Sequence, residues 1–383
     1  MAPRIRRYAR RVTEYPEVGS TSGGRISPSG STPWDDDAFR AGIESTLQGF
    51  IDGQAAWLAD LGEDARRLVE HARISVSGGK RFRASFCWWG HLAVAEPLDR
   101  DALLRACASL ELLHASALVH DDYMDASDTR RGRPATHRAF EALHLQQGWN
   151  ASPAQYGASA AILLGDLLLS WSDELLRTSG LPSDRVLDAL GFFDLTRTEV
   201  VAGQFLDVSA QARGTTDVDL AMTVLRYKSA KYSIERPLHL GAALAGASPA
   251  VIDQLTGFGL PLGEAFQLRD DLLGVFGDPE VTGKPAGDDL VEGKRTVLIA
   301  LALAALGPAD RKHLDTSLGN PLTAAEVADL RTLIDGSGAR DEVEEMITRL
   351  TAQALEALAS ADIRDDARAV LRELAAAATQ RTV

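Results

Sequence analysis

The segment HDDYMDASDTRRGRP, residues 120–134, places four carboxylates, three arginines and a histidine directly after the apolar run LLHASALV. Asp121 and Asp125 are four residues apart, so on a helix both side chains lie on one face. Two such carboxylates repel each other unless a cation lies between them. Magnesium suits this arrangement, because it binds carboxylate oxygens and completes its shell with water and phosphate oxygens. Asp122 is a further candidate ligand, and a solvated helix face is the alternative interpretation.

A second acidic pair lies in FQLRDDLLGVFGD, residues 266–278, where Asp270 and Asp271 interrupt another apolar helical run. Gln267 precedes Asp270 by three residues and shares its helical face. Charges inside apolar helices need partners, and two such pairs in separate helices are poorly explained as solvated faces. A role in binding metal ions is therefore the favoured interpretation.

Cationic side chains recur around these acidic segments. Arginine forks and lysine point charges are the groups that bind phosphates. Each cluster alone fits a surface salt bridge, but together with two metal sites they predict a pocket for diphosphate. The segment GQFLD adds Gln204 and Asp207, a polar pair inside an apolar helix, and Ser229 follows one of the lysines. The cationic candidates are Lys80, Arg81, Arg83, Arg130, Arg131, Lys228, Lys284 and Lys294.

The elements that must position these residues are helices. Residues 103, 107, 110, 114, 117 and 121 are spaced by three or four and form one stripe, which is apolar at its start and ends at Asp121. From residue 36 onward, Ala/Leu-rich stretches at helical period are separated by short Gly/Pro/Asp turns. The sequence therefore predicts a single all-α domain over residues 36–383. A disordered leader, rich in Gly, Ser and Pro, is expected over residues 1–35.

The composition disfavours several classes of protein. The 383-residue chain has a formal net charge of −14, which disfavours nucleic-acid binding because phosphate backbones require a basic surface. Its two cysteines, Cys87 and Cys107, lie in apolar stretches without CxxC spacing, which predicts buried thiols in a reducing cytoplasm. No segment contains about eighteen uninterrupted apolar residues, so no transmembrane helix is expected.

Six motifs, GGKRFR, HDDYMDASDTRRGRP, GQFLD, KSAKY, FQLRDD and GKPAGDDLVEGKRT, occur in an order and spacing similar to those of the trans-isoprenyl diphosphate synthases. The chain most resembles the bacterial geranylgeranyl diphosphate synthases, from about residue 45 to the C-terminal helices. The resemblance implies an all-α, isoprenoid-synthase-type helical bundle around a deep central cavity, and a homodimer. It also implies an isoprenoid-biosynthesis transferase that uses magnesium, at about three ions per active site, bound by carboxylates and phosphates. Such an enzyme condenses isopentenyl diphosphate with an allylic diphosphate (dimethylallyl, geranyl or farnesyl).

The resemblance also implies roles for the matching residues. The allylic diphosphate would be held through magnesium by Asp121, Asp125 and Asp270, with Asp122 and Asp271 as adjoining acids. It would be contacted directly by Arg130, Lys228 and Lys294, and Lys284 resembles the lysine of a loop after the second acidic motif. Isopentenyl diphosphate would be bound by Lys80, Arg83, His114 and Arg131, with Arg81 in the same motif. The candidate catalytic residues are Gln204, Asp207, Lys228, Ser229 and Gln267.

Two residues depart from the family pattern. Gly274 stands where the second acidic motif commonly carries a third acid, and Ala84 replaces a proline after GGKRFR. We expect activity nevertheless, because Asp270 is the expected ligand of that motif and is present. The small residues Ser116 and Ala117, before the first acidic motif, imply the twenty-carbon geranylgeranyl product. The alternatives are a longer-chain or farnesyl product, a class I terpene cyclase, and a non-catalytic subunit of a heteromeric synthase.

Overall fold

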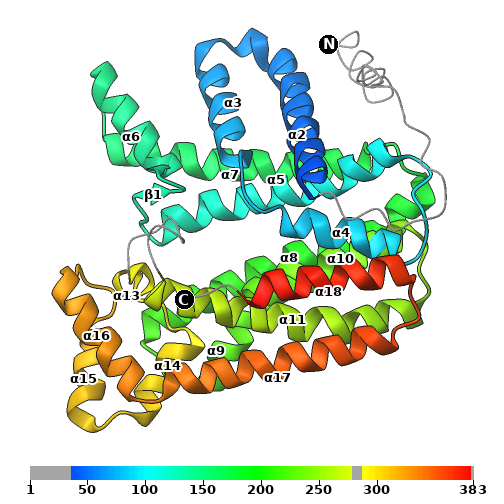
Figure 1. Ribbon diagram of the computed structural model, residues 1–383. Helices are drawn as coiled ribbons and strands as arrows, with labels where there is room; N and C mark the ends of the chain where they lie inside the picture. The colour runs from blue at the N-terminus through cyan, green and yellow to red at the C-terminus, as the bar shows by residue number, and fades with distance from the viewer. Residues whose placement is uncertain (1–35, 278–286, 381–383) are drawn as a thin grey trace.

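The computed structural model describes residues 36–277 and 287–380, which form helices joined by short turns (Figure 1). The elements are α2 (Asp36–Leu58), η1 (Ala59–Leu61), α3 (Glu63–Val76), α4 (Phe82–Leu92), α5 (Arg100–Met124), β1 (Thr129–Arg130), β2 (Arg133–Pro134), α6 (Thr136–Gln147), α7 (Pro153–Arg177), α8 (Ser183–Arg213), α9 (Val218–Val224), η2 (Leu225–Glu235), α10 (Arg236–Leu244), α11 (Pro249–Phe276), α13 (Asp288–Glu292), α14 (Val297–Ala305), α15 (Pro308–Ser317), α16 (Ala324–Gly336), α17 (Ala339–Ser360) and α18 (Asp365–Thr379). The predicted all-α class is confirmed. The leader over residues 1–35 lies outside the described residues, and the single-domain boundary stays a prediction.

The central helix α5 carries the predicted stripe that ends at Asp121. It begins after Asp99, whose side chain accepts a hydrogen bond from the Ala102 N–H at 2.9 Å and so satisfies a free amide of the first turn. The helix ends at Met124, and Asp125 forms its C-cap. Among the described helices, α5 alone has the length and hydropathy to span a membrane, but 72% of its apolar window is buried inside the fold. Such burial is typical of a core helix.

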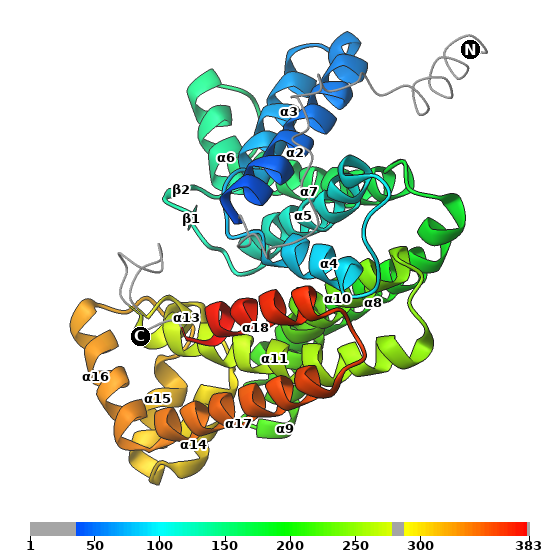
Figure 2. The ribbon, with the colours of Figure 1, turned by 45° about the vertical axis from the view of Figure 1, so that its right-hand side comes forward.

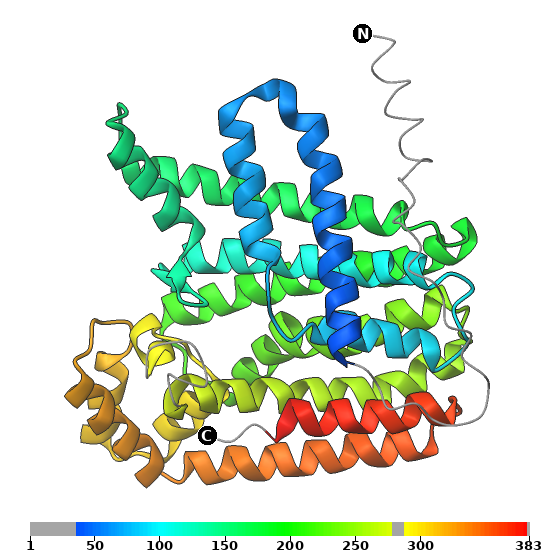
Figure 3. The same ribbon diagram turned by 45° about the horizontal axis from the view of Figure 1, so that its top comes forward.

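The helices pack around two hydrophobic clusters. The first includes the buried Trp88 and Phe193 and lies among α2, α3, α4, α5, α7, α8, η2, α10, α11, α17 and α18. The second lies among α9, α11, α14, α16 and α17, and it includes Leu298 and Val343. Figures 2 and 3 show α11, α17 and α18 side by side, with the α2–α3 hairpin projecting on the opposite side of the molecule. Because η2, α11 and α17 contribute side chains to both clusters, they join the two.

The segment η2 is a π-helix, whose amide–carbonyl bonds span five residues. One of these bonds joins the Arg236 N–H to the Lys231 carbonyl. Pro237 follows directly and has no N–H, so it cannot donate the α-helical bond to the Ser233 carbonyl. Segments of this kind are rare and often mark functional sites, and η2 carries the predicted site residues Lys228 and Ser229.

Two glycines allow η2 to lie against the backbones of its neighbours. A Cβ at Gly203 of α8 would stand 2.3 Å from the Lys228 backbone nitrogen, and a Cβ at Gly263 of α11 would stand 2.4 Å from the Ala230 carbonyl oxygen. Because protein interiors are close-packed, a larger residue at either position would push η2 away from its neighbour. These two contacts therefore determine where the side chains of η2 enter the site.

Gly203→Ala should lower Tm, whereas Gly191→Ala should raise it. Both glycines lie on α8, but a Cβ at Gly191 would meet nothing within 4 Å. An exposed helical glycine is about 0.5–1 kcal/mol less favourable than alanine, while overpacking at Gly203 costs about 1–3 kcal/mol. Thermal unfolding followed by circular dichroism compares the two variants, and a Tm for Gly203→Ala at or above wild type would contradict the close contact with η2.

Candidate active site

The acidic end of α5 meets two other helices. The Asp121 carboxylate accepts a hydrogen bond from Gln204 Nε2 of α8 at 2.9 Å, and it lies 3.4 Å from Lys228 Nζ of η2. Lys228 Nζ is in turn 2.6 Å from a carboxylate oxygen of Asp207, which follows Gln204 on α8. The structure therefore brings together four predicted site residues from three segments of the chain.

Asp121 and Asp125 differ in how far their charges are compensated. Burial disfavours the Asp121 carboxylate, but the cations of Lys228, Lys294 and Arg130 outweigh burial and lower the pKa of this group. Burial and the nearby charge of Asp121 instead raise the pKa of Asp125 to about 6, against the smaller effect of Lys294. The pair therefore holds negative charge that its neighbours do not fully neutralise, and a divalent cation would relieve it.

Asp122 has a different partner. It is buried, and its Oδ1 accepts hydrogen bonds from two nitrogens of Arg130, with the Nε bond at 2.8 Å. Charge-assisted bonds of this kind hold both groups in place. The contact assigns Asp122 to holding Arg130, whose charge also acts on Asp121. The role of Asp122 as a metal ligand stays a prediction.

The second acidic pair lies on α11, and the side-chain amide of Gln267 links Asp271 of this pair to Ser229 of η2. The Ser229 hydroxyl donates a hydrogen bond to Gln267 Oε1, and Gln267 Nε2 donates to Asp271 Oδ1 at 2.7 Å. Burial raises the pKa of Asp271 to about 8 despite the Gln267 bond, and the charges of Asp289 and Asp270 add to the rise. This carboxyl group is therefore protonated at neutral pH unless a further cation approaches it.

Lys294 is surrounded by three carboxylates, two of which, Asp289 and Glu292, the motif analysis did not select. Its Nζ lies 2.5 Å from Glu292, 3.3 Å from Asp289 and 3.6 Å from Asp125. Asp289 and Glu292 lie on the short helix α13, within the segment GKPAGDDLVEGKRT. A signal was present, because both acids precede Lys294 by only a few residues. Lys284, predicted from the same segment, lies outside the described residues.

Asp289 also accounts for the missing third acid of the second motif. A Cβ at Gly274 would stand 1.9 Å from Asp289 Oδ2. The carboxylate of Asp289 therefore occupies the space that a side chain at position 274 would enter. The present placement of Asp289 therefore requires a glycine at position 274, and Gly274→Asp would displace the Asp289 carboxylate. Although position 274 carries no acid, the Asp289 carboxylate lies beside it.

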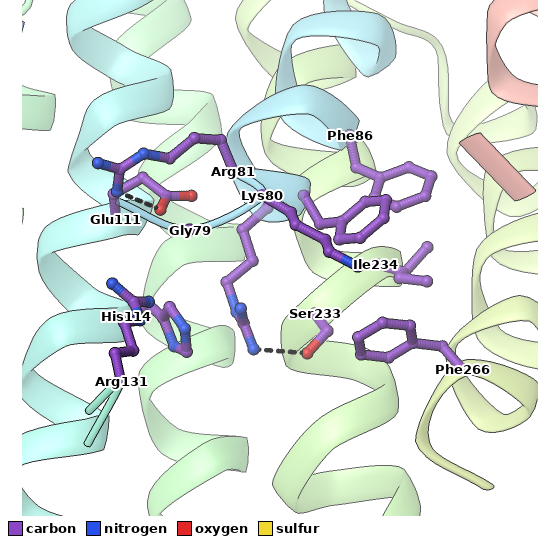
Figure 4. Close-up of a pocket in the computed structure, with 12 residues that line it drawn as sticks. Gly79, Lys80, Arg81, Phe86, Glu111, His114, Arg131, Ser233, Ile234 and Phe266 are labelled. Carbon is purple, nitrogen blue, oxygen red and sulfur yellow. Dashed lines mark hydrogen bonds and ion pairs between the residues drawn. The ribbon is translucent and has the colours of Figure 1, made fainter. Parts of the chain in front are cut away.

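The cations predicted to bind isopentenyl diphosphate line a single pocket (Figure 4). Its volume is about 430 Å³, including the open mouth. The polar part of the wall includes the cations Lys80, Arg83 and Arg131, together with His114. The apolar part of the wall includes Phe82, Phe86, Ile234 and Phe266. A pocket with convergent polar groups on an otherwise apolar wall suits a ligand that has an anionic head and an apolar tail.

A glycine turn brings the first two motifs together at this pocket. Gly79 has a φ of 96°, and a Cβ there would stand 3.1 Å from Arg131 Nη2. Glycine adopts this left-handed conformation without steric cost. The Arg131 guanidinium also donates a hydrogen bond to the Ser77 carbonyl, so the turn holds Arg131 beside Lys80.

Arg81 differs from the other cations of its motif, because its guanidinium has three protein acceptors. It donates to Glu111 Oε2 at 3.0 Å, to the Val76 carbonyl at 2.7 Å, and to a carboxylate oxygen of Glu44. Arg81 and Glu111 are each only 5% exposed. Arg81 therefore ties α2, α3 and α5 to the start of α4, and its part in substrate binding stays a prediction.

Two residues of η2 that the motif analysis did not select, Tyr232 and Ser233, contact His114 and Arg83 of the pocket. His114 Nδ1 lies 2.8 Å from the Tyr232 hydroxyl, and Arg83 Nη2 donates to Ser233 Oγ at 2.8 Å. Burial, together with the charges of Arg83 and Arg131, holds the pKa of His114 well below its usual range, so the imidazole is neutral. A signal for Tyr232 was present, since it is the last residue of the motif KSAKY.

Across residues 36–277 and 287–380, no three His, Cys, Asp or Glu side chains converge into a preformed metal site. Lys228 and Lys294 instead contact the acids of this region. Magnesium commonly binds through one or two carboxylates and takes its remaining ligands from substrate phosphates and water. The oxygen donors of Asp121 and Asp125, with their uncompensated charge, fit that partial site.

A family model described as polyprenyl synthetase matches residues 66–335, well over half of the chain. The chain belongs to the polyprenyl synthetase family. This polyprenyl synthetase is therefore a trans-isoprenyl diphosphate synthase, as its six motifs predicted. A solved structure of geranylgeranyl pyrophosphate synthase from Corynebacterium glutamicum, in complex with isoprenyl diphosphate and magnesium, is 43% identical to it. That structure superposes with a TM-score of 0.88 and covers 91% of this chain and 100% of its own.

Relatives with other product names are also similar to this polyprenyl synthetase. The geranylfarnesyl diphosphate synthase of Natronomonas pharaonis is 34% identical over 247 residues, which cover 61% of this chain and 67% of that protein. The (2E,6E)-farnesyl diphosphate synthase of Mycobacterium tuberculosis H37Rv is 32% identical over 287 residues, which cover 74% of this chain and 75% of that protein. Overall similarity therefore does not select one chain length for the product.

Arg81→Ala should destabilise the fold, whereas Arg83→Ala should weaken binding of isopentenyl diphosphate with little change in Tm. Loss of Arg81 leaves the buried charge of Glu111 without its partner, which costs about 3–5 kcal/mol, while Arg83 bonds the neutral Ser233. Thermal unfolding and isothermal titration calorimetry measure the two effects. If Arg81→Ala keeps its Tm and loses the ligand as Arg83→Ala does, Arg81 is a ligand contact.

Proposed function

We propose that this chain condenses isopentenyl diphosphate with an allylic diphosphate and forms geranylgeranyl diphosphate as its main product. The observation that carries this proposal is the presence of two regions of opposite charge along one helix. One is the acidic region around Asp121 and Asp125, and the other is the cationic pocket around His114. Seven residues of α-helix separate His114 from Asp121, about 10 Å along the axis. A condensation of two diphosphates requires both sites.

In this proposal the allylic diphosphate binds at the acidic site. Asp121, Asp125 and Asp270 would hold magnesium ions, with phosphate oxygens and water completing their shells. When bound, the metal stabilises the negative charge that develops on the departing diphosphate. Lys228 and Lys294 place fixed positive charge in the same region, where a preorganised cation is most effective.

The side chains around the two sites orient the reactants. Arg130, held by Asp122, would contact the allylic diphosphate, while Asp207 holds Lys228 and Gln204 holds Asp121. The allylic C–O bond breaks, and the double bond of isopentenyl diphosphate attacks the allylic carbon. The released diphosphate then accepts the proton lost from the isopentenyl unit. Ser229 and Gln267, which bond each other at this position, would face the reacting carbons.

We also propose a homodimer in the cytoplasm. Large apolar side chains are exposed on α7 and α8, among them Leu163 at 61%, Val201 at 65% and Phe205 at 70%. Exposed apolar groups of this size are enriched at subunit interfaces. Cys87 and Cys107 are buried free thiols, which supports a reducing compartment.

The length of the product would be set by the apolar residues that precede Asp121 on α5. Ser116 and Ala117 are small, and at the helical rise Ala117 lies about 6 Å from Asp121. Leu113 and Leu110 are buried and lie about 12 and 16 Å from Asp121 along the axis. The side chains nearest Asp121 on this side of α5 are therefore small, and the leucines stand further along the helix. This arrangement supports the twenty-carbon product over the farnesyl alternative.

Asp121→Asn and Asp125→Asn should each lower kcat by at least about 100-fold, because an amide cannot replace an anionic metal ligand worth several kcal/mol. Asp128→Asn is the matched control, since Asp128 lies in the same segment with 74% of its side chain exposed and pairs only at the surface with Arg138. Incorporation of radiolabelled isopentenyl diphosphate onto geranyl diphosphate at saturating magnesium measures the rates. Near wild-type turnover in either acidic variant would remove the metal assignment.

Ala117→Phe should shorten the main product to farnesyl diphosphate, because an aromatic ring about 6 Å beyond Asp121 would close the apolar space. Leu110→Ala should have the opposite effect and lengthen the product. Chromatography of the dephosphorylated products gives the chain lengths. A wild-type enzyme that stops at fifteen carbons, or an unchanged product from Ala117→Phe, would show that α5 does not set the length.

A further inference from the structure

Tyr232 and Ser233 are consecutive residues of η2 and are both buried, with 4% and 1% of their surfaces exposed. They reach two different helices at the cationic pocket. The Tyr232 hydroxyl lies 2.8 Å from His114 Nδ1 of α5, and Ser233 Oγ accepts a hydrogen bond from Arg83 Nη2 of α4 at 2.8 Å. Figure 4 shows His114 and Ser233 at the pocket, with Arg131 beside His114. One short segment therefore contacts two of the predicted diphosphate ligands.

The hydrogen bond between Tyr232 and His114 joins two neutral groups. Burial raises the pKa of Tyr232 to about 12, so the phenol is protonated, and His114 is neutral. The guanidinium of Arg83 stands 4.2 Å from the centre of the Tyr232 ring, and a guanidinium has donors only. It cannot accept the phenolic proton. When Tyr232 donates its proton to His114 Nδ1, the imidazole proton stands on Nε2, the other ring nitrogen.

Arg83 is held by the same two residues of η2. Its Nη2 bonds Ser233, and its guanidinium lies over the ring of Tyr232. Its Nε is buried and has no hydrogen-bond acceptor within the described residues. A buried charged donor without an acceptor is costly. Because Lys80 and Arg131 also line this pocket, the missing acceptor is best supplied by an anionic oxygen.

We propose that Tyr232 and Ser233 are positioning residues for isopentenyl diphosphate. Tyr232 fixes the tautomer that places the His114 proton on Nε2, and Ser233 fixes the Arg83 guanidinium, so both donors face the diphosphate before it binds. The proposal rests on the proposed binding of isopentenyl diphosphate in this pocket. Donors that are already oriented lose little entropy on binding, so this arrangement acts on affinity for one substrate.

Steady-state kinetics of the full chain with magnesium test the role of Tyr232. Tyr232→Phe keeps the ring under Arg83 and removes only the hydroxyl. We expect the KM for isopentenyl diphosphate to rise about 5- to 10-fold, as for the loss of one hydrogen bond, with the KM for geranyl diphosphate unchanged. Tyr227→Phe is the matched control, because Tyr227 lies on the same helix beside Lys231, away from the pocket residues. It should leave both constants at wild-type values.

Double-mutant cycles show whether the hydroxyls act through their partners. In a His114→Ala background, Tyr232→Phe should have no further effect on the KM for isopentenyl diphosphate, and Ser233→Ala should likewise have none in an Arg83→Ala background. Additive effects, or equal changes in the constants of both substrates, would overturn the positioning role.

A measurement on the wild-type chain keeps the proposal testable if a variant fails to fold. Nitrogen-15 NMR of histidine-labelled protein reports the tautomer of His114, whose signal is the one absent from His114→Ala. A proton on Nδ1 would overturn the proposal. Calorimetry with isopentenyl diphosphate distinguishes a failure of the proposed function from a failure of the positioning role. Absence of binding would overturn the proposed function, while binding with an unaltered constant in Tyr232→Phe would overturn only the positioning role.

Discussion

Three carboxylates of α5 lie buried or half-buried in an apolar helical bundle, where each of them requires a partner of opposite charge. Glu111 has Arg81, Asp121 has Lys228, and Asp122 has Arg130. These partners come from other segments of the chain, so the surrounding helices must converge on α5. Positive and negative charges do not cancel at either end of the site. Carboxylates are in excess beyond Asp121, and cations are in excess around His114. The binding of a metal ion and of an anion follows from these two residual charges.

Much of this arrangement was predictable from the sequence. The three-and-four spacing that ends at Asp121 predicted α5, and the structure adds Asp99 as the N-cap at its start. The two acidic pairs and the cationic motifs predicted which residues would gather around metal and diphosphate, and the family match confirmed the activity they imply. Helical periodicity is a local property, so it was readable without knowledge of how the helices pack.

Contacts across helices were not readable in the same way. Arg81 and Arg83 are two residues apart in one motif and both line the pocket, yet Arg81 bonds two carboxylates while Arg83 bonds the neutral Ser233. The motif alone could not separate them, because the difference depends on where Glu44 and Glu111 lie. Asp289 is a similar case, since its contact with the space above Gly274 depends on how α13 packs against α11. The π-helical bonding of η2 also left no periodic signal in so short a segment.

The hydrogen-bond register of η2 affects which changes of sequence the site can accommodate. A five-residue bonding pattern places Lys228 and Ser229 toward the acidic site, while Tyr232 and Ser233 lie toward the cationic pocket. Each residue of an α-helix turns the chain by about 100°. Deleting one residue between these two pairs would therefore rotate one pair away from the side chains that it contacts, even though all four residues of the pairs were kept. Substitutions in η2 alter single contacts, whereas an insertion or deletion would uncouple the two halves of the site.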